Sequence, residues 1–391
     1  METSRVLGVI LAGMLALAAS ACSSSDSGGM GPTGGSGGNA GSAGSAGQDA
    51  GGGSAGSQSD AGDASAEGGA AGDSGIEDAT EEEASTPAQR GEYLVKHVSA
   101  CGDCHTPRKQ DGSPDLAKWL AGNPGMFEVP GLGPDGGVGI VSPKNLTPDV
   151  ATGLGSWTDA QIKSAILDGV DDEGKALFPI MPYYVFHNMT SEDADAIVAY
   201  LKTIPAVSNA IPENNFDTPA PAPPVPAAEI PDTTLATTDP GYASAVRGKY
   251  LASSVAPCME CHTLHVQTPG AVPLDMTKAF AGGEPFYSAA MHLPPIFPPV
   301  IYSANITPDT TGLAGWAPDN IVTVLHQGVD KDGHSVCPPM PVGPQGAFGG
   351  MSSIDALDIA NYLLSIAPKV NDVPKCEPSD GGPPPADAST E

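Results

Sequence analysis

The apolar positions of one central segment recur with the period of an α-helix. Ile162 and Ile166 share one face of such a helix. Thr158 precedes them and Gln161 follows it by three residues, which is the spacing of a capping box. Gly169 stands where a helix end favours a left-handed residue. The pattern therefore predicts an amphipathic helix between Thr158 and Gly169.

A second helical stripe begins near Ser191 and stops before Pro205. Its apolar residues are spaced to share one face, and they are Ala194, Ile197, Val198 and Leu201. No pair of neighbouring segments alternates apolar and polar residues in the way that paired strands do. Helices joined by loops rich in Pro and Gly are expected, so the predicted fold class is all-α.

Every block of this pattern occurs twice and in the same order, which indicates an internal repeat. The first block reads RGEYLVKHVSACGDCHTPR from Arg90 and RGKYLASSVAPCMECHTLH from Arg247. Later blocks pair NLTPDVATGLGSW with NITPDTTGLAGW, FPIMPYY with CPPMPVG, and MTSEDADAIVAYL with MSSIDALDIANYL. In the second copy, Pro318 and Gly328 stand where a helix is predicted to start and end.

The repeat predicts two tandem domains, over residues 87–205 and 243–376. A Pro-rich linker, 206–242, separates them, and residues 377–391 are predicted to be a disordered tail. Each copy has few aromatic residues and long loops, which is too little side-chain core for a small domain by itself. A bound group is therefore expected to complete the interior of each helical bundle.

The N-terminus has the layout of a secretory signal. A short charged start is followed by an apolar run from Val6 to Ala19 and by small residues before Cys22. The run is too short to span a bilayer comfortably. Residues 1–21 are predicted to be a signal peptide, which places the mature protein in the periplasm or cell envelope. The residues around Cys22 resemble a lipoprotein box and favour its lipidation and membrane anchoring; a free, soluble N-terminus is the alternative.

Residues 22–86 are rich in Gly, Ser and Ala, contain acidic residues and lack Lys and Arg. Such a segment cannot bury enough apolar surface to fold, so it is predicted to be a disordered acidic tether. The whole chain has a formal net charge of −30. This charge argues against nucleic acid or anionic lipid as a partner and is compatible with a basic protein surface.

Two Cys-x-x-Cys-His motifs stand at equivalent places in the two copies. They are Cys101-Gly-Asp-Cys104-His105 and Cys258-Met-Glu-Cys261-His262. A zinc site needs a second pair of ligands nearby, but these pairs lie 157 residues apart, and a redox dithiol needs a βαβ context that is absent. Haem attachment needs two thiols for the vinyl groups and an adjacent imidazole for the iron. Two covalently bound haem c groups are therefore predicted.

These motifs, preceded by R-G-x-Y-L and followed by the M-P dipeptide and the terminal helix, resemble those of bacterial di-haem cytochromes c. The chain looks most similar to the cytochrome c subunits that accept electrons from membrane-bound alcohol and sugar dehydrogenases. The resemblance covers residues 90–205 and 247–368. It implies two bundles of a few helices, each wrapped around a haem held by thioethers and by the histidine of the motif.

The histidine of each motif supplies one axial ligand, and the second ligand must come from farther along the same copy. No other histidine recurs at an equivalent position, but two methionine pairs do, Met181 with Met340 and Met189 with Met351. Met189 and Met351 precede N-cap residues, where an apolar side chain usually packs on the first helical turn. Met181 and Met340 lie in loops before a proline, and the resemblance also selects the M-P methionine. We therefore predict that Met181 and Met340 bind iron.

Other repeated residues are expected to have structural roles. Tyr93 and Tyr250 are expected to pack the first helix of each copy onto the last, with Gly91 and Gly248 allowing close approach. The histidines expected to lie in solvent are His97, His265 and His334.

Two cysteines remain, Cys337 and Cys376. In an oxidising compartment they are expected to form a disulfide, which closes a loop of about 40 residues and contributes about 4 kcal/mol. The alternative is that Cys337, three residues from Met340, binds iron as a thiolate.

The predicted function is electron transfer without catalysis. An exported di-haem cytochrome c would carry single electrons from a dehydrogenase or other donor to a small cytochrome or oxidase. No Ser/His pair, carboxylate pair or nucleotide-binding loop indicates chemistry of the chain's own. The alternative is a di-haem redox enzyme, similar to a thiosulfate dehydrogenase or a peroxidase, with substrate at an open or Cys-ligated iron.

Overall fold

Short helices joined by long loops make up most of the described chain. The computed structural model describes residues 85–110, 112–266, 273–291 and 293–377. The predicted signal peptide, and nearly all of the predicted tether and tail, lie outside these residues. The described residues all belong to one compact unit. Within them, no helix has the length and apolar character needed to span a membrane.

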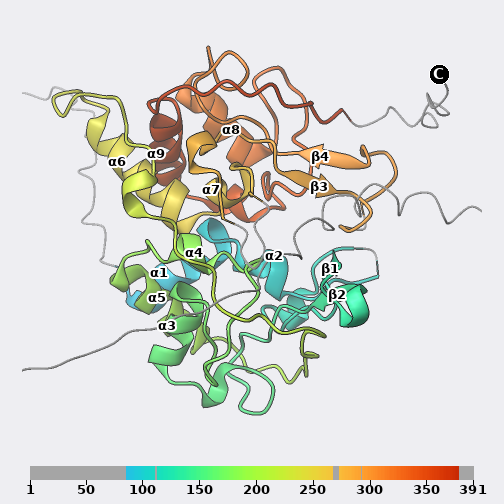
Figure 1. Cartoon of the computed structure of the whole chain (residues 1–391). Coiled ribbons are helices and arrows are strands. Elements are labelled where there is room, and N and C mark those ends of the chain that lie inside the picture. The colour runs from blue at the N-terminus through green and yellow to red at the C-terminus, as the bar shows by residue number, and fades with distance from the viewer. Residues whose placement is uncertain (1–84, 111, 267–272, 292, 378–391) are drawn as a thin grey trace, which may run out of the picture. The chain divides into compact units, whose positions relative to one another are not determined.

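The two copies of the sequence repeat fold into nearly the same order of elements (Figure 1). The helices of the first copy are α1 (Pro87–Tyr93), α2 (Cys101–His105), α3 (Asp159–Leu167), α4 (Tyr183–Phe186) and α5 (Ser191–Leu201). Those of the second copy are α6 (Tyr242–Tyr250), α7 (Cys258–Cys261), α8 (Pro318–Gln327) and α9 (Ser353–Leu363). Single turns of π- or 3₁₀-helix accompany them: η2 (Leu94–Val98), η3 (Leu116–Lys118), η4 (Pro134–Gly136), η5 (Leu154–Ser156), η6 (Ala227–Glu229), η7 (Leu251–Val255), η8 (Met276–Lys278) and η9 (Ala347–Gly350).

The helix signals of the sequence are confirmed at the predicted positions. Thr158 and Gln161 form the reciprocal hydrogen bonds of a capping box at the start of α3. Gly169 has a φ of 65°, the left-handed conformation expected after a helix end. Pro318 begins α8, and Gly328 ends it with a φ of 68°. Local hydrogen bonding and backbone freedom therefore set these helix bounds.

The expectation of no strand is wrong. Strand β1 (Phe127–Pro130) pairs antiparallel with β2 (Val138–Val141), with Phe127 opposite Val141. Strand β3 (Pro285–Tyr287) pairs in the same way with β4 (Val300–Tyr302). The strands are only three or four residues long, so no alternation could develop along them. The fold is mostly α rather than all-α.

In each copy the first helix packs against the last, α1 on α5 and α6 on α9 (Figure 1). The predicted role of the two glycines is confirmed, because a Cβ at Gly91 would lie 1.9 Å from Ala196 O, and a Cβ at Gly248 would lie 1.8 Å from Asp358 O. No side chain fits in that space. Glycine therefore sets the separation of the two helices, and this packing holds the motif that follows the first helix.

The tyrosines do not act as expected, because they join the two copies to each other. Tyr93 donates a hydrogen bond to Asp355 Oδ2 (2.6 Å), on α9 of the other copy. Tyr250 donates one to Asp193 Oδ2 (2.7 Å), on α5 of the first copy. Each tyrosine follows a tightly packed glycine by two residues, so its ring leaves the helix pair of its own copy and reaches the other.

Candidate metal centres

Each Cys-x-x-Cys-His motif forms a short helical turn directly behind a π-helical turn, η2 before α2 and η7 before α7. π-turns inside helices often occur at functional sites. None of the four motif cysteines forms a disulfide. Burial raises the pKa of Cys101, Cys104 and Cys258 to about 12 and raises that of Cys261 further. Buried neutral thiols are suited to a covalent bond with an apolar group and poorly suited to redox exchange, which proceeds through the thiolate.

The two motif histidines are held in the same way. His105 Nδ1 donates to the carbonyl of Lys144 (2.7 Å), and His262 Nδ1 donates to the carbonyl of Ala304 (2.8 Å). Burial lowers the pKa of both imidazoles. The neutral ring then carries its hydrogen on Nδ1 and leaves the lone pair on Nε2, which is the arrangement that a metal-binding histidine requires.

An asparagine fixes the carbonyl that orients each histidine. Asn145, directly after Lys144, accepts hydrogen bonds from the backbone and the hydroxyl of Thr147 (2.9 and 2.8 Å) and donates to Val207 O (2.8 Å). Asn305 makes the same bonds to Thr307 (3.0 and 2.8 Å) and to Lys369 O (2.8 Å). The repeated N-x-T-P-D block therefore supports the histidine from behind.

Sequence reasoning missed a second support, in the threonine after each histidine. Thr106 Oγ1 accepts a hydrogen bond from Leu120 N, and Thr263 Oγ1 accepts one from Phe280 N, both at 3.1 Å. Leu120 and Phe280 have positive φ values of 59° and 63°, which L residues rarely adopt. The sequence signal for this support is the block K-x-[LF]-A-G, which occurs in both copies and contains Leu120 and Phe280 as its third residue. A strained backbone conformation that recurs in both copies indicates a fixed backbone at the site.

The methionines separate into a buried and a half-buried pair. Met189 and Met351 are 6% and 4% exposed and pack in the core, as expected for residues next to an N-cap. Met181 and Met340 are half-buried in the loops before α4 and η9. Both loops turn alike, because Met181 O accepts from Tyr183 N (2.8 Å) and Met340 O accepts from Val342 N (2.9 Å).

Cys337 and Cys376 form a disulfide across a sequence separation of 39. The bond joins the C-terminal segment to the loop that carries Met340. The expected disulfide is confirmed, and Cys337 is not available as a thiolate iron ligand in this structure.

The expectation that His265 lies in solvent is wrong. Its ring is 13% exposed, and Nε2 lies 3.2 Å from Glu260 Oε1 while Nδ1 lies 3.1 Å from Glu284 Oε2. The hydroxyl of Tyr184, which belongs to the first copy, donates to Glu260 and lies 3.0 Å from His265 Nε2. Burial would lower the pKa of His265, but the bonds and charges of Glu260 and Glu284 outweigh burial and raise it to about 10. We call these four residues the buried charge cluster.

His97 also departs from expectation, because its ring packs on Gly350 and lies 3.2 Å from Ala347 O in the other copy. His334 is confirmed as solvated, with 77% of its side chain exposed.

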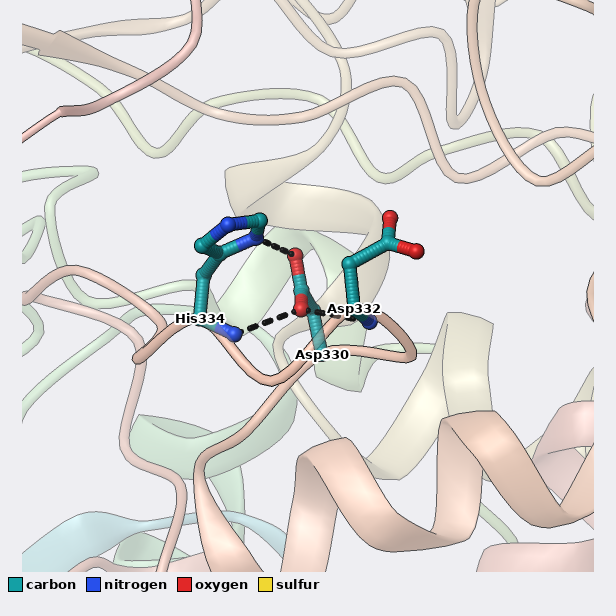
Figure 2. Close-up of side chains that lie close together, drawn as sticks. All are labelled: Asp330, Asp332 and His334. Atoms are coloured by element: carbon teal, nitrogen blue, oxygen red, sulfur yellow. Dashed lines mark hydrogen bonds and ion pairs between the residues drawn. The ribbon is translucent and has the colours of Figure 1, made fainter.

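Figure 2 shows that His334 lies in a turn beside Asp330 and Asp332. The Asp330 carboxylate accepts hydrogen bonds from the backbone N–H groups of Asp332 (2.9 Å) and His334 (2.8 Å). In the first copy, Asp171 accepts the same bond from the backbone of Lys175 (2.8 Å). Lys175 stands where the second copy has His334, and the turn has the same backbone hydrogen bond in both copies. The turn geometry therefore explains why Asp330, Asp332 and His334 lie close together, without a metal ion.

The donor set of each copy fits a covalently attached haem. It offers two thiols on one helical turn, an imidazole whose Nε2 is free, and a half-buried thioether in a loop. Of the four thiols in the two copies, that of Cys258 is buried and the other three are half-buried. Cysteine thiols form the covalent thioether links of a c-type haem, and imidazole and the methionine thioether are the axial ligands of cytochromes c.

Comparison with known proteins agrees with this chemistry. Residues 88–205 match the family described as cytochrome c. The chain is 26% identical over 322 residues to the cytochrome c subunit of alcohol dehydrogenase (quinone) from Gluconacetobacter polyoxogenes, covering 77% of this chain and 59% of that protein. It is 24% identical over 308 residues to the fructose dehydrogenase cytochrome subunit of Gluconobacter japonicus, covering 75% and 55%. A diheme cytochrome c-type protein of Cereibacter sphaeroides is 30% identical over 129 residues, covering 32% and 38%. The chain thus spans less than two thirds of the length of these relatives.

Proposed function

We propose, starting from the cytochrome c domain at residues 88–205, that this chain is a two-haem cytochrome c that transfers single electrons between protein partners. That domain implies covalently bound haem c. The proposal extends it to a second domain over residues 243–376 and to a second haem. The proposed thioether anchors are Cys101, Cys104, Cys258 and Cys261, and the proposed axial ligands are His105, Met181, His262 and Met340.

The observation that carries the proposal is the repetition of the histidine geometry. His105 and His262 each donate Nδ1–H to a carbonyl placed by an Asn-x-Thr block, at 2.7 and 2.8 Å. A structural histidine does not need its Nε2 kept free next to two unpaired thiols. Because the second copy reproduces every one of these contacts, it supports a second site of the same kind.

The chain's own residues would hold the redox centre and close it. Bound haem c supplies the one-electron redox change of iron. The cysteines would attach the haem covalently, and histidine and methionine would both ligate the iron, which would leave no position for a substrate and raise the reduction potential relative to two histidines. Such a site exchanges electrons and performs no bond chemistry.

The proposed partners are redox proteins. The relatives are named as cytochrome subunits of alcohol and fructose dehydrogenases, which supports a dehydrogenase as donor. A small cytochrome or an oxidase is the proposed acceptor. The signal-like residues 1–21 support export to the periplasm or cell envelope, and Cys22 is the proposed point of lipid attachment to a membrane.

The alternative enzyme would place a substrate at an open or thiolate-bound iron. Cys337 is disulfide-bonded to Cys376, which removes the thiolate ligand on which one form of that hypothesis depends. The carrier proposal is therefore the one that the geometry favours.

The test is the mass and spectrum of the exported protein. Two haems per chain and a near-infrared sulfur-to-iron band are expected. Met181→Ala and Met340→Ala should each remove about half of that band, because each deletes one thioether ligand, whereas the matched variants Met189→Leu and Met351→Leu should keep it. A chain without haem, or a band that follows Met189 and Met351, contradicts the proposal.

A further inference from the structure

We propose that the buried charge cluster of Tyr184, Glu260, His265 and Glu284 makes the second redox centre the lower in potential, so that electrons pass from the second copy to the first. This inference rests on the proposed function, since it assumes a haem on each Cys-x-x-Cys-His motif. It assigns to four residues outside the ligand set the task of ordering the two centres.

The cluster lies on the second motif itself. Glu260 stands between Cys258 and Cys261 on α7, and His265 follows the motif histidine by three residues. Glu284 accepts the backbone N–H of His265 (2.9 Å) in addition to its contact with the ring. The side chains of Glu260 and Glu284 are 15% and 20% exposed, so water screens their charges poorly.

The cluster has an excess of negative charge even when its histidine is protonated. Two carboxylates surround one imidazole, and the fourth member, Tyr184, is 3% exposed and contributes a neutral hydroxyl. A negative charge near a haem opposes the arrival of an electron, and the Coulomb interaction grows as the dielectric constant falls. The ferric state of the second centre is therefore favoured.

Among the residues that the structure describes, the first motif has no such cluster. Asp103, at the position of Glu260, is exposed. Arg108 stands where the second copy has His265, and its guanidinium donates to Gly112 O (3.0 Å) in its own loop. Pro124 takes the position of Glu284 in the repeat. The surroundings of the first motif are therefore less negative and better screened, which keeps its centre the higher in potential.

Tyr184 lies between the two sites, which fits electron transfer from the second centre to the first. It follows Met181, the proposed ligand of the first centre, by three residues, and its hydroxyl donates to Glu260 between the anchors of the second. With haem bound at both motifs, one electron would leave the ferrous iron of the second centre, which would become ferric, and would reduce the first iron from ferric to ferrous. The dehydrogenase of the proposed function supplies the electron, and the respiratory acceptor removes it.

The experiment is a redox titration of the full-length, haem-loaded protein followed by optical and electron paramagnetic resonance spectroscopy. Two waves are expected in the unmodified protein, and Met340→Ala should move the lower wave while Met181→Ala moves the higher. Glu260→Gln should raise the lower wave and leave the higher wave in place. His265→Gln should lower the same wave, because it removes a positive charge.

Potential shifts of opposite sign in Glu260→Gln and His265→Gln distinguish a charge effect from a loss of structure. Asp103→Asn is the matched control, and it should change the higher wave by less than Glu260→Gln changes the lower one. If Glu260→Gln fails to accumulate, Glu284→Gln tests the same charge from another loop and should also raise the lower wave.

Three outcomes would overturn the inference. Glu260→Gln could shift both waves equally, Glu260→Gln and His265→Gln could shift the lower wave in the same direction, or Met340→Ala could move the higher wave. Two haems per chain with unmoved potentials would reject the inference alone. Fewer than two haems would reject the proposed function together with it.

Discussion

Asn145 and Asn305 show how much of each site depends on residues that would not touch a haem. In each, the amide oxygen accepts two hydrogen bonds from one threonine, and the amide nitrogen donates a hydrogen bond to the carbonyl of a residue distant in sequence. The backbone carbonyl just before it then orients a histidine. Ligand geometry at this scale is set by the supporting hydrogen bonds as much as by the ligand.

The pH dependence of stability is a residue-scale consequence of His265. Its pKa is about 10 in the folded chain, above the ordinary value of 6.5, so its contribution to stability is complete below about pH 6.5 and is lost as the pH rises towards 10. Between these limits the free energy of unfolding should fall by about 1.4 kcal/mol per pH unit from this group.

Urea unfolding of the haem-loaded protein at pH 7 and pH 9 measures this slope. His265→Gln should flatten the slope, whereas the exposed His334→Gln should keep it. Equal slopes in the unmodified protein and in His265→Gln would show that His265 is not protonated in the folded chain.

The residues of the motifs could be predicted from sequence because covalent attachment needs a fixed local spacing. The cluster around His265 could not, since Tyr184 and Glu284 are brought to it by loops from two directions. A lone histidine near the surface of a short domain is ordinarily solvated. Only the tertiary fold shows that two carboxylates surround this one.

At the scale of elements, the separation of the first and last helix of each copy positions the motif. Gly248 on α6 lies so close to α9 that a Cβ would fall 1.8 Å from Asp358 O. Arg247 on the same turn donates Nε–H to Asp358 Oδ2 (2.6 Å), which ties the two helices on their outer side. The helix pair therefore tolerates no increase in volume at this point.

Gly248→Ala should destabilise the protein by about 1–3 kcal/mol or more, because the methyl group overlaps a backbone carbonyl that cannot move alone. The thermal midpoint of the haem-loaded protein is the measurement. Val246→Ala, a change at an exposed position of the same helix, should have little effect. Equal midpoints for Gly248→Ala and the unmodified chain would contradict the close packing.

Helix starts and ends were predictable because they depend on neighbours within four residues, as the capping box at Thr158 shows. The strand pairs were not, because β3 and β4 are three residues long and pair across a long loop. Their stability comes from partners distant in sequence, and a short strand has no periodicity of its own.

For the whole molecule, the main feature is the reciprocal pair of tyrosines. Tyr93 accepts the N–H of Ser352 (3.0 Å) and donates to Asp355, and Tyr250 accepts the N–H of Thr190 (3.2 Å) and donates to Asp193. Each hydroxyl thus binds the N-terminus of the last helix in the opposite copy. The two copies therefore make this contact twice, in opposite directions, alongside the contacts of Tyr184 with Glu260 and of His97 with Ala347 O.

The double variant Tyr93→Phe with Tyr250→Phe removes two hydrogen bonds to carboxylates. Each of these hydrogen bonds contributes about 1.5–3 kcal/mol to the free energy of unfolding. Calorimetry should show a single unfolding transition for the unmodified chain and a transition with a lower midpoint for the double variant, because the two copies then stabilise each other less. Tyr287→Phe, an exposed change, should keep the midpoint of the unmodified chain. An unchanged midpoint in the double variant would show that other contacts hold the copies together.

The reciprocal tyrosines also bear on the symmetry of the chain. One copy carries both a donor tyrosine and an acceptor aspartate at its last helix, so its surface is complementary to itself, as in an isologous dimer. A single copy produced alone would present that surface to a second molecule. The chain therefore reproduces within itself the reciprocal contact that an isologous dimer makes between two molecules.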